Sequence, residues 1–168
     1  GGAERVISIL SNNLTVLGHE AHVVLCARSP RDYPVAQAVN MHVLPGRRSA
    51  LMRKLSRVTE IRRVLRQVQP DFVVPFVDNL IYAAFLASRG LPVAYISAVR
   101  NHPSIRSAVR AERLINRIVN LFADAVFLQT WDQASFYSRR IQSKAFVVPN
   151  PVSDAFTVAP PVLIEQVE

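Results

Sequence analysis

The chain begins with Gly1-Gly2-Ala3-Glu4-Arg5, which leads directly into a segment with the apolar spacing of an amphipathic helix. Two glycines at a helix N-terminus leave backbone N–H groups open to an anion, and the helix adds about half a positive charge there. Such a turn normally follows a parallel strand at the carboxyl edge of a sheet. We therefore expect a parallel sheet whose first strand lies before residue 1.

Downstream of this turn, short apolar runs alternate with segments of helical spacing, and the connections are short. Strands are predicted at residues 22–27, 39–45, 72–77, 93–99, 125–129 and 145–148. Helices are predicted at 3–17, 49–68, 78–87 and 130–140, together with a long helix that follows the loop at 100–103 and ends near residue 122. Pro75 is expected to bulge or shorten its strand. This alternation is typical of an α/β fold with a Rossmann-like, doubly wound parallel sheet and right-handed crossovers. Residues 1–151 are interpreted as one domain and the proline-bearing residues 152–168 as an interdomain linker.

Helix ends carry recognisable capping residues. Gly18 follows the last periodic residue of the first helix, where glycine is favoured. Asp78 stands where a side chain caps the third helix. Thr130 and Gln133 have the spacing of a capping box, in which each side chain bonds a free backbone N–H group of the other residue.

The composition favours an anionic partner and disfavours several classes of enzyme. The 168 residues include 20 Lys and Arg against 12 Asp and Glu, a formal charge of +8, and a single cysteine that cannot form an internal disulfide. No apolar run approaches the roughly 20 residues that span a bilayer, and no signal peptide is visible. Nucleophile elbows, Walker loops and His/Cys metal spacings do not occur, which sets aside the catalytic classes that depend on them. DNA binding is disfavoured because no recognition-helix motif occurs.

Basic residues line one face of the predicted helix at 49–68. They are the candidates for contact with an anionic membrane surface: Arg53, Lys54, Arg57 and Arg62. A second Arg-rich helix carries Arg106, Arg110, Arg113 and Arg117. A solvated outer face and a face near lipid headgroups both explain this pattern, and each basic residue near a membrane contributes about 1 kcal/mol.

Polar residues and glycines follow the predicted strands, at the edge where open α/β sheets bind ligands. These candidates are Gly1, Gly2, Asp78, Asn79, Arg100, Asn101, His102, Thr130 and Asn150. Each has a simpler interpretation as well: the glycines as a tight connection, Asp78 as a cap, Asn150 as a turn residue. His102 either donates to a sugar hydroxyl or phosphate or is a solvated loop residue. Their expected convergence on one rim is the stronger argument.

Three stretches together resemble glycosyltransferase family four. Gly1-Gly2-Ala3-Glu4-Arg5-Val6 with Leu17-Gly18-His19-Glu20-Ala21-His22-Val23 is similar to the family's start just after the first strand. Gln69-Pro70-Asp71-Phe72-Val73-Val74 looks like its fourth-strand entry, and Val147-Val148-Pro149-Asn150-Pro151-Val152 like its exit from the N-terminal domain. The resemblance extends from residue 1 to about residue 156.

This resemblance implies the N-terminal, acceptor-side half of a retaining GT-B enzyme that uses a nucleotide-sugar donor and no metal. It implies that Gly1 and Gly2 approach the donor phosphate and that His102 is the catalytic residue. Acceptor or sugar binding is expected of Asp78, Asn79, Arg100 and Asn101. The acceptor would be a glycan or a lipid-linked glycan, and the enzyme would be cytoplasmic, held at the inner membrane face. Because the donor-binding half is absent from the sequence, this chain alone is expected to be inactive.

Two other functions remain open. A non-catalytic α/β ligand-binding module needs no second half and would bind its ligand alone. A sugar-nucleotide epimerase of the GT-B type would need carboxylates at the rim, where Asp78 is the only good candidate.

Overall fold

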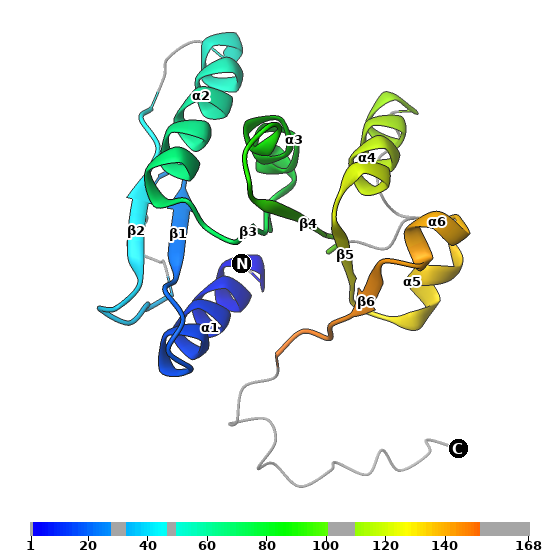
Figure 1. Ribbon diagram of the computed structural model, residues 1–168, viewed down its shortest axis with the longest axis horizontal. Coiled ribbons are helices and arrows are strands. Elements are labelled where there is room, and N and C mark those ends of the chain that lie inside the picture. Colours follow the sequence, from blue (N-terminus) through cyan, green and yellow to red (C-terminus); the bar gives the residue numbers. More distant parts are fainter. Residues whose placement is uncertain (1, 28–32, 47–49, 101–109, 152–168) are drawn as a thin grey trace, which may run out of the picture.

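The computed structural model describes residues 2–27, 33–46, 50–100 and 110–151 (Figure 1). The predicted linker at 152–168 lies outside them. The described elements alternate between helices and strands over most of their length. In chain order they are α1 (Gly2–Val16), β1 (His22–Leu25), β2 (Asn40–Val43), α2 (Ala50–Val68), β3 (Phe72–Val73), α3 (Asp78–Ser88), β4 (Ala94–Ala98), α4 (Arg110–Phe122), β5 (Ala125–Leu128), α5 (Trp131–Ser135), α6 (Arg139–Gln142) and β6 (Ala145–Val147).

Every strand pairing in the described residues is parallel, as predicted. The strands form a two-stranded sheet, β1-β2, and a four-stranded sheet, β3-β4-β5-β6. Helices α2, α3 and α4 lie together on one face of the strands, and α1 lies on the other (Figure 1). The doubly wound α/β arrangement is therefore confirmed. Within the described residues β1 and β3 do not pair, so the sheet is interrupted between them. The strand expected before residue 1 stays a prediction.

The largest apolar core lies between the four-stranded sheet and its helices. Tyr95 of β4 is completely buried there, its hydroxyl donates to the carbonyl of Ile81 at 3.1 Å, and its ring meets Phe85 edge-on. A second core holds α2 against α3 through Ile61 and Ala87, among others. These contacts fix α3 over the sheet and thereby fix the start of β4.

Helix α1 ends as predicted and buries part of its apolar face: Val6 is buried, and Ile7 and Leu14 pack against a core cluster. Gly18 has a φ of 85°, a conformation that glycine adopts without strain, and the N–H of His19 bonds the carbonyl of Leu14 at 2.9 Å. The buried residues of α1 include Ser8 and Ser11, whereas Leu17, predicted to be on the apolar face, is 72% exposed. Ser8 faces the segment after β1, where its hydroxyl donates to the carbonyl of Pro34.

Two further details differ from the sequence predictions, and a third, the shortening of a strand at Pro75, confirms one. The N-cap of α3 is Val77, without a side-chain cap, so the prediction that Asp78 caps this helix was wrong. The strand at 72–77 is only Phe72–Val73, because Pro75 lacks the N–H that a central strand needs. The helix predicted to reach Arg140 divides into α5 and α6. Ser138, in an extended conformation, separates the two pieces.

Candidate functional site

The carboxyl ends of β4, β5 and β6 meet at one edge of the four-stranded sheet. Backbone hydrogen bonds continue past the strands there: the N–H of Val99 bonds Phe127 at 2.8 Å, and the N–H of Val148 bonds Leu128 at 2.7 Å. The residues that follow these bonds along the chain are therefore held in register with one another. They are Arg100, Gln129 and Asn150, and we call them the rim cluster.

Asn150 joins the three side chains of the rim cluster. Its Oδ1 accepts a hydrogen bond from Nη2 of Arg100 and another from Nε2 of Gln129 at 3.0 Å. Arg100 and Asn150 are 50 residues apart in sequence, so only the parallel sheet brings them together. The prediction that these two candidates share one rim is confirmed.

Arg100 presents a partly desolvated cation at this edge. Its guanidinium lies 5.3 Å from the ring centre of Phe76, and burial lowers its pKa below the ordinary value for arginine. An arginine remains protonated at neutral pH even so, and its planar group carries five N–H donors. The contact with Asn150 uses one of them, and a guanidinium is a group that binds phosphates and carboxylates.

The start of α5 fixes the backbone next to the rim cluster. Thr130 is the N-cap of α5, and its hydroxyl oxygen accepts the N–H of Gln133 at 3.4 Å. Gln133 is buried, and its Oε1 accepts the N–H of Gln129 at 2.6 Å. The predicted capping box is present, with the amide bonding the N–H one residue before the cap. Thr130 therefore has a structural role that accounts for its position.

Several predicted site residues lie outside the described part of the chain. Gly1, Asn101 and His102 are among them, as are the side chains of Asp78 and Asn79, although these two residues begin α3. Gly2 is described and is the first residue of α1. A methyl group added to Gly2 would meet no atom within 4 Å.

Two residues of this edge were missed by the sequence analysis. Gln129 was assigned to the end of a strand, and Phe76 to the middle of one. The signal for Gln129 was present, because it follows β5 as Arg100 follows β4. For Phe76 the signal was Pro75, which ends the strand early and places Phe76 in the loop at its carboxyl end.

The basic residues of α2 do not share one environment. Arg62 is half-buried, and its Nη1 donates to the carbonyls of Ala87 and Arg89, each at 2.8 Å, at the C-terminal end of α3. Arg57 is also half-buried, whereas Arg63 is exposed and pairs with Glu60 at 2.9 Å. The side chains of the other two candidates, Arg53 and Lys54, lie outside the described set.

Two further features of the described residues are the metal-ligating side chains and the lengths of the helices. No group of three or more His, Cys, Asp or Glu side chains is placed there to hold a metal ion. None of the helices in the described part of the chain combines the length and the apolar character that crossing a bilayer requires.

Comparisons with known proteins identify one family from the sequence and one fold from a solved structure. The model of a family described as Glycosyltransferase Family 4 matches residues 1–156. Among solved structures, the crystal structure of Anabaena HepE in complex with UDP and glucose matches with a TM-score of 0.63 at 14% identity. The match covers 90% of this chain and 42% of HepE, so the chain spans less than half of that protein. No curated protein sequence matches. The shared fold is Rossmann-like, as in one half of a GT-B glycosyltransferase.

Proposed function

This chain belongs to glycosyltransferase family 4, and from that membership we propose that it forms the acceptor-side half of a GT-B enzyme. The enzyme transfers a sugar from a nucleoside diphosphate to a hydroxyl of a glycan or lipid-linked acceptor, with retention of configuration. The UDP and glucose in the HepE structure support a nucleotide-sugar donor by analogy. The residues that grip the diphosphate would come from a second half.

The rim cluster is the observation that carries this proposal. Arg100, Gln129 and Asn150 place a cation and two amides at the carboxyl edge of parallel strands, where open α/β sheets bind their ligands. Amide side chains orient sugar hydroxyls through donor and acceptor pairs. The guanidinium of Arg100 adds charge complementarity to a departing phosphate.

The reaction exchanges one bond at the anomeric carbon. The bond from that carbon to the phosphate oxygen breaks, and its electron pair leaves with the diphosphate. The acceptor oxygen bonds the carbon, and the proton of the acceptor hydroxyl passes to the departing phosphate oxygen. The N–H groups of Gly1 and Gly2 at the start of α1 would face the developing phosphate charge. His102 would be the catalytic residue of the loop after β4. Asn101, Asp78 and Asn79 would orient the sugar or the acceptor. No metal or other cofactor is proposed.

The test begins with the native polypeptide that contains this sequence. Its intact mass should be about twice that of the 168-residue chain, and it should transfer sugar from UDP-sugars or related donors to glycan acceptors. His102→Ala and Arg100→Gln should each lower turnover at least tenfold while the thermal melt stays unchanged. Arg63→Gln, an exposed arginine of α2, is the matched control and should have full activity.

Two results would overturn the proposal. A native polypeptide that ends near residue 168 would lack a donor site, and ligand binding by the chain alone would then favour the non-catalytic module. If the Arg100→Gln variant has the same turnover as the wild type, the rim cluster is not part of the active site.

A further inference from the structure

Helix α4 is oriented with its apolar side toward solvent. Leu114, Ile118 and Phe122 are spaced four residues apart and therefore lie in one row along the helix. Their exposed fractions are 60%, 40% and 61%, and the neighbouring Ile115 is 43% exposed. A surface helix of a globular domain normally buries such a row.

The opposite side of α4 is held inward by hydrogen bonds to asparagines. Asn120 is 3% exposed, and its Oδ1 accepts from the buried hydroxyl of Ser97 at 2.7 Å. One turn earlier, Oδ1 of Asn116 accepts from the hydroxyl of Tyr82 at 3.1 Å. Breaking these bonds to turn the helix would leave buried polar groups without partners, which costs about 1–3 kcal/mol each. The outward direction of the apolar row is therefore built into the packing.

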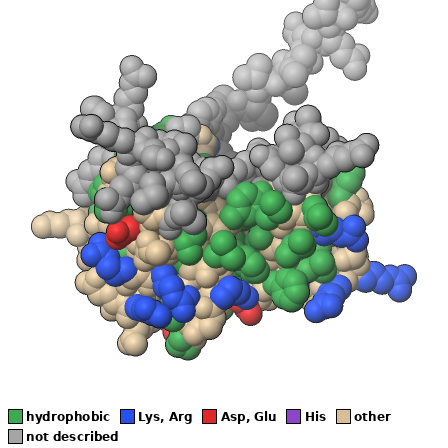
Figure 2. Space-filling view, turned by 90° about the horizontal axis from the view of Figure 1, so that it is seen from above, with side chains coloured by type: hydrophobic (Ala, Val, Ile, Leu, Met, Phe, Trp, Pro, Cys, Tyr) green, Lys and Arg blue, Asp and Glu red, His purple; other side chains and the backbone are tan. Residues whose placement is uncertain are grey.

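The apolar row belongs to a larger patch on the face formed by α2, α3 and α4. Figure 2 looks onto this face and shows hydrophobic side chains gathered on one part of it, with Lys and Arg side chains on both sides. Leu86 of α3 is 55% exposed, and the next turn of its helix reaches α4 where Arg89 donates to the carbonyl of Phe122. We define the α4 patch by its exposed members: Leu86, Leu114, Ile115, Ile118 and Phe122.

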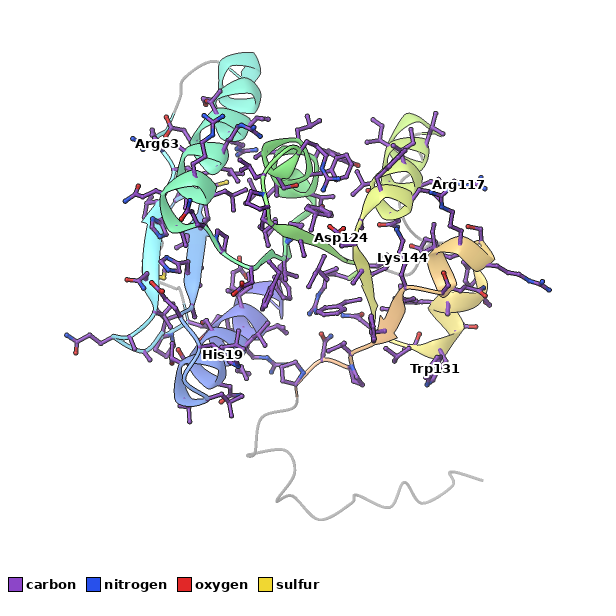
Figure 3. All side chains as sticks on the ribbon, in the orientation of Figure 1. His19, Arg63, Arg117, Asp124, Trp131 and Lys144 are labelled. Carbon is purple, nitrogen blue, oxygen red and sulfur yellow. The ribbon has the colours of Figure 1, made fainter. Side chains whose placement is uncertain are left out.

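The described side chains of this face carry an excess of positive charge. Those of α2, α3 and α4 include five arginines (Arg57, Arg62, Arg63, Arg66 and Arg117) and one acid, Glu60, whereas α1, on the other face, contains one basic and one acidic residue. Arg117 of α4 is exposed beside the patch (Figure 3). An apolar row with basic residues beside it matches the interface of an anionic bilayer, where the row enters the acyl boundary and the cations meet headgroups.

We propose that the α4 patch is a docking surface for an anionic lipid bilayer. The interaction is peripheral: the row of Leu114, Ile118 and Phe122 inserts, and Arg117 contacts lipid phosphates. This assignment moves the membrane contact expected of α2 to the neighbouring helix, because Arg62 is occupied by the end of α3. It does not rest on glycosyl transfer, since a bilayer surface is the only ligand it requires.

The experiment measures sedimentation of the native polypeptide that contains this sequence with two kinds of vesicle, phosphatidylcholine alone and phosphatidylcholine with phosphatidylglycerol. We expect binding to the anionic vesicles only, with weakening in high salt. The triple variant Leu114→Gln/Ile118→Gln/Phe122→Gln should bind about tenfold more weakly or worse, since three apolar side chains no longer leave water. Arg117→Gln should weaken binding by about fivefold.

A matched control uses exposed apolar residues on the opposite face. Val16→Gln/Leu17→Gln changes side chains that are 85% and 72% exposed at the C-terminal end of α1 and should bind like the wild type. Far-ultraviolet circular dichroism should show that all variants are folded. A variant with Phe122→Trp and Trp131→Phe should show a blue-shifted fluorescence on anionic vesicles. Trp131 of the wild type, 78% exposed on α5 and distant from Arg117 in Figure 3, should not.

Three results would overturn the proposal. The first is equal vesicle binding by the wild type and the triple variant. The second is equal loss of binding in the α1 control, which would show that any exposed apolar residue suffices. The third is a wild-type dimer that the triple variant dissolves, with no binding to vesicles, which would assign the patch to a second copy of the chain.

Discussion

Replacing Arg62 by methionine tests whether α2 uses this arginine to hold α3. Methionine keeps much of the apolar stem and removes both hydrogen bonds, to the carbonyls of Ala87 and Arg89, each at 2.8 Å. A net hydrogen bond from a charged group contributes about 1.5–3 kcal/mol when buried. Arg62 is only half-buried, so we expect about 1 kcal/mol for each bond and about 2 kcal/mol in all.

The adjacent arginine provides the matched control. Arg63 is 73% exposed and pairs with Glu60 across one turn of α2, a contact that contributes about 0.3–0.5 kcal/mol. Urea unfolding followed by circular dichroism should therefore place Arg62→Met about 1.5 kcal/mol below Arg63→Met in free energy of unfolding. The melting temperature should fall by about 4–8 °C for Arg62→Met, given the size of the chain.

Two outcomes of this comparison are informative. If the two variants unfold within about 0.5 kcal/mol of each other, the bonds of Arg62 to α3 contribute nothing and the reasoning fails. Binding to anionic vesicles should also be the same for both folded variants. If only Arg62→Met lost binding to the vesicles, Arg62 would contact the membrane, as the sequence analysis suggested.

Three further predictions concern stability. Tyr95→Phe removes the bond to the carbonyl of Ile81 and should cost about 1 kcal/mol in urea unfolding; an unchanged midpoint would show that the bond adds nothing. Lys144→Met removes the donors to the carbonyls of Leu121 and Ala123 at the C-terminal end of α4 and should cost about 1–2 kcal/mol, whereas an unchanged melt would show that these bonds add nothing. Burial, and then the charge of His22, lowers the pKa of His42 below its ordinary value of 6.5. As the pH falls, the unfolded chain therefore binds a proton at His42 before the folded chain does. Stability should therefore be complete above about pH 6.5 and decrease as the pH falls below it, and a His42→Gln variant that keeps the same decrease would refute this cause.

Local sequence patterns predicted the helices, the strands and the polar residues at the carboxyl edge of the sheet, but not the direction in which individual side chains point. Strands were predictable because each is an apolar run, and Arg100 and Asn150 because each follows one. The direction of Arg62 was also available in principle. With about 100° per residue, Arg62 lies beside the buried row of Ile61 and Leu65, and Arg63 lies opposite it.

The orientation of α4 is different, because periodicity shows that a helix has an apolar row but not which way the row faces. That choice depends on the partners of Asn116 and Asn120. Both partners, Tyr82 and Ser97, come from elements 23 or more residues away in the chain. A preference for burying the apolar row therefore predicts the wrong face, and only the tertiary hydrogen bonds decide it.

The path of α4 connects the two proposed surfaces. Phe122 stands just before Ala125, at the amino end of β5, so the helix runs back along the sheet from the carboxyl edge. Leu114 is eight residues earlier and thus about 12 Å closer to that edge. Four residues of β5 span a similar length, about 13 Å, which places Leu114 near the level of the rim cluster. A bilayer that receives the α4 patch therefore lies beside the edge where Arg100 and Asn150 meet. The head of a lipid-linked acceptor would then reach the site without leaving the membrane surface.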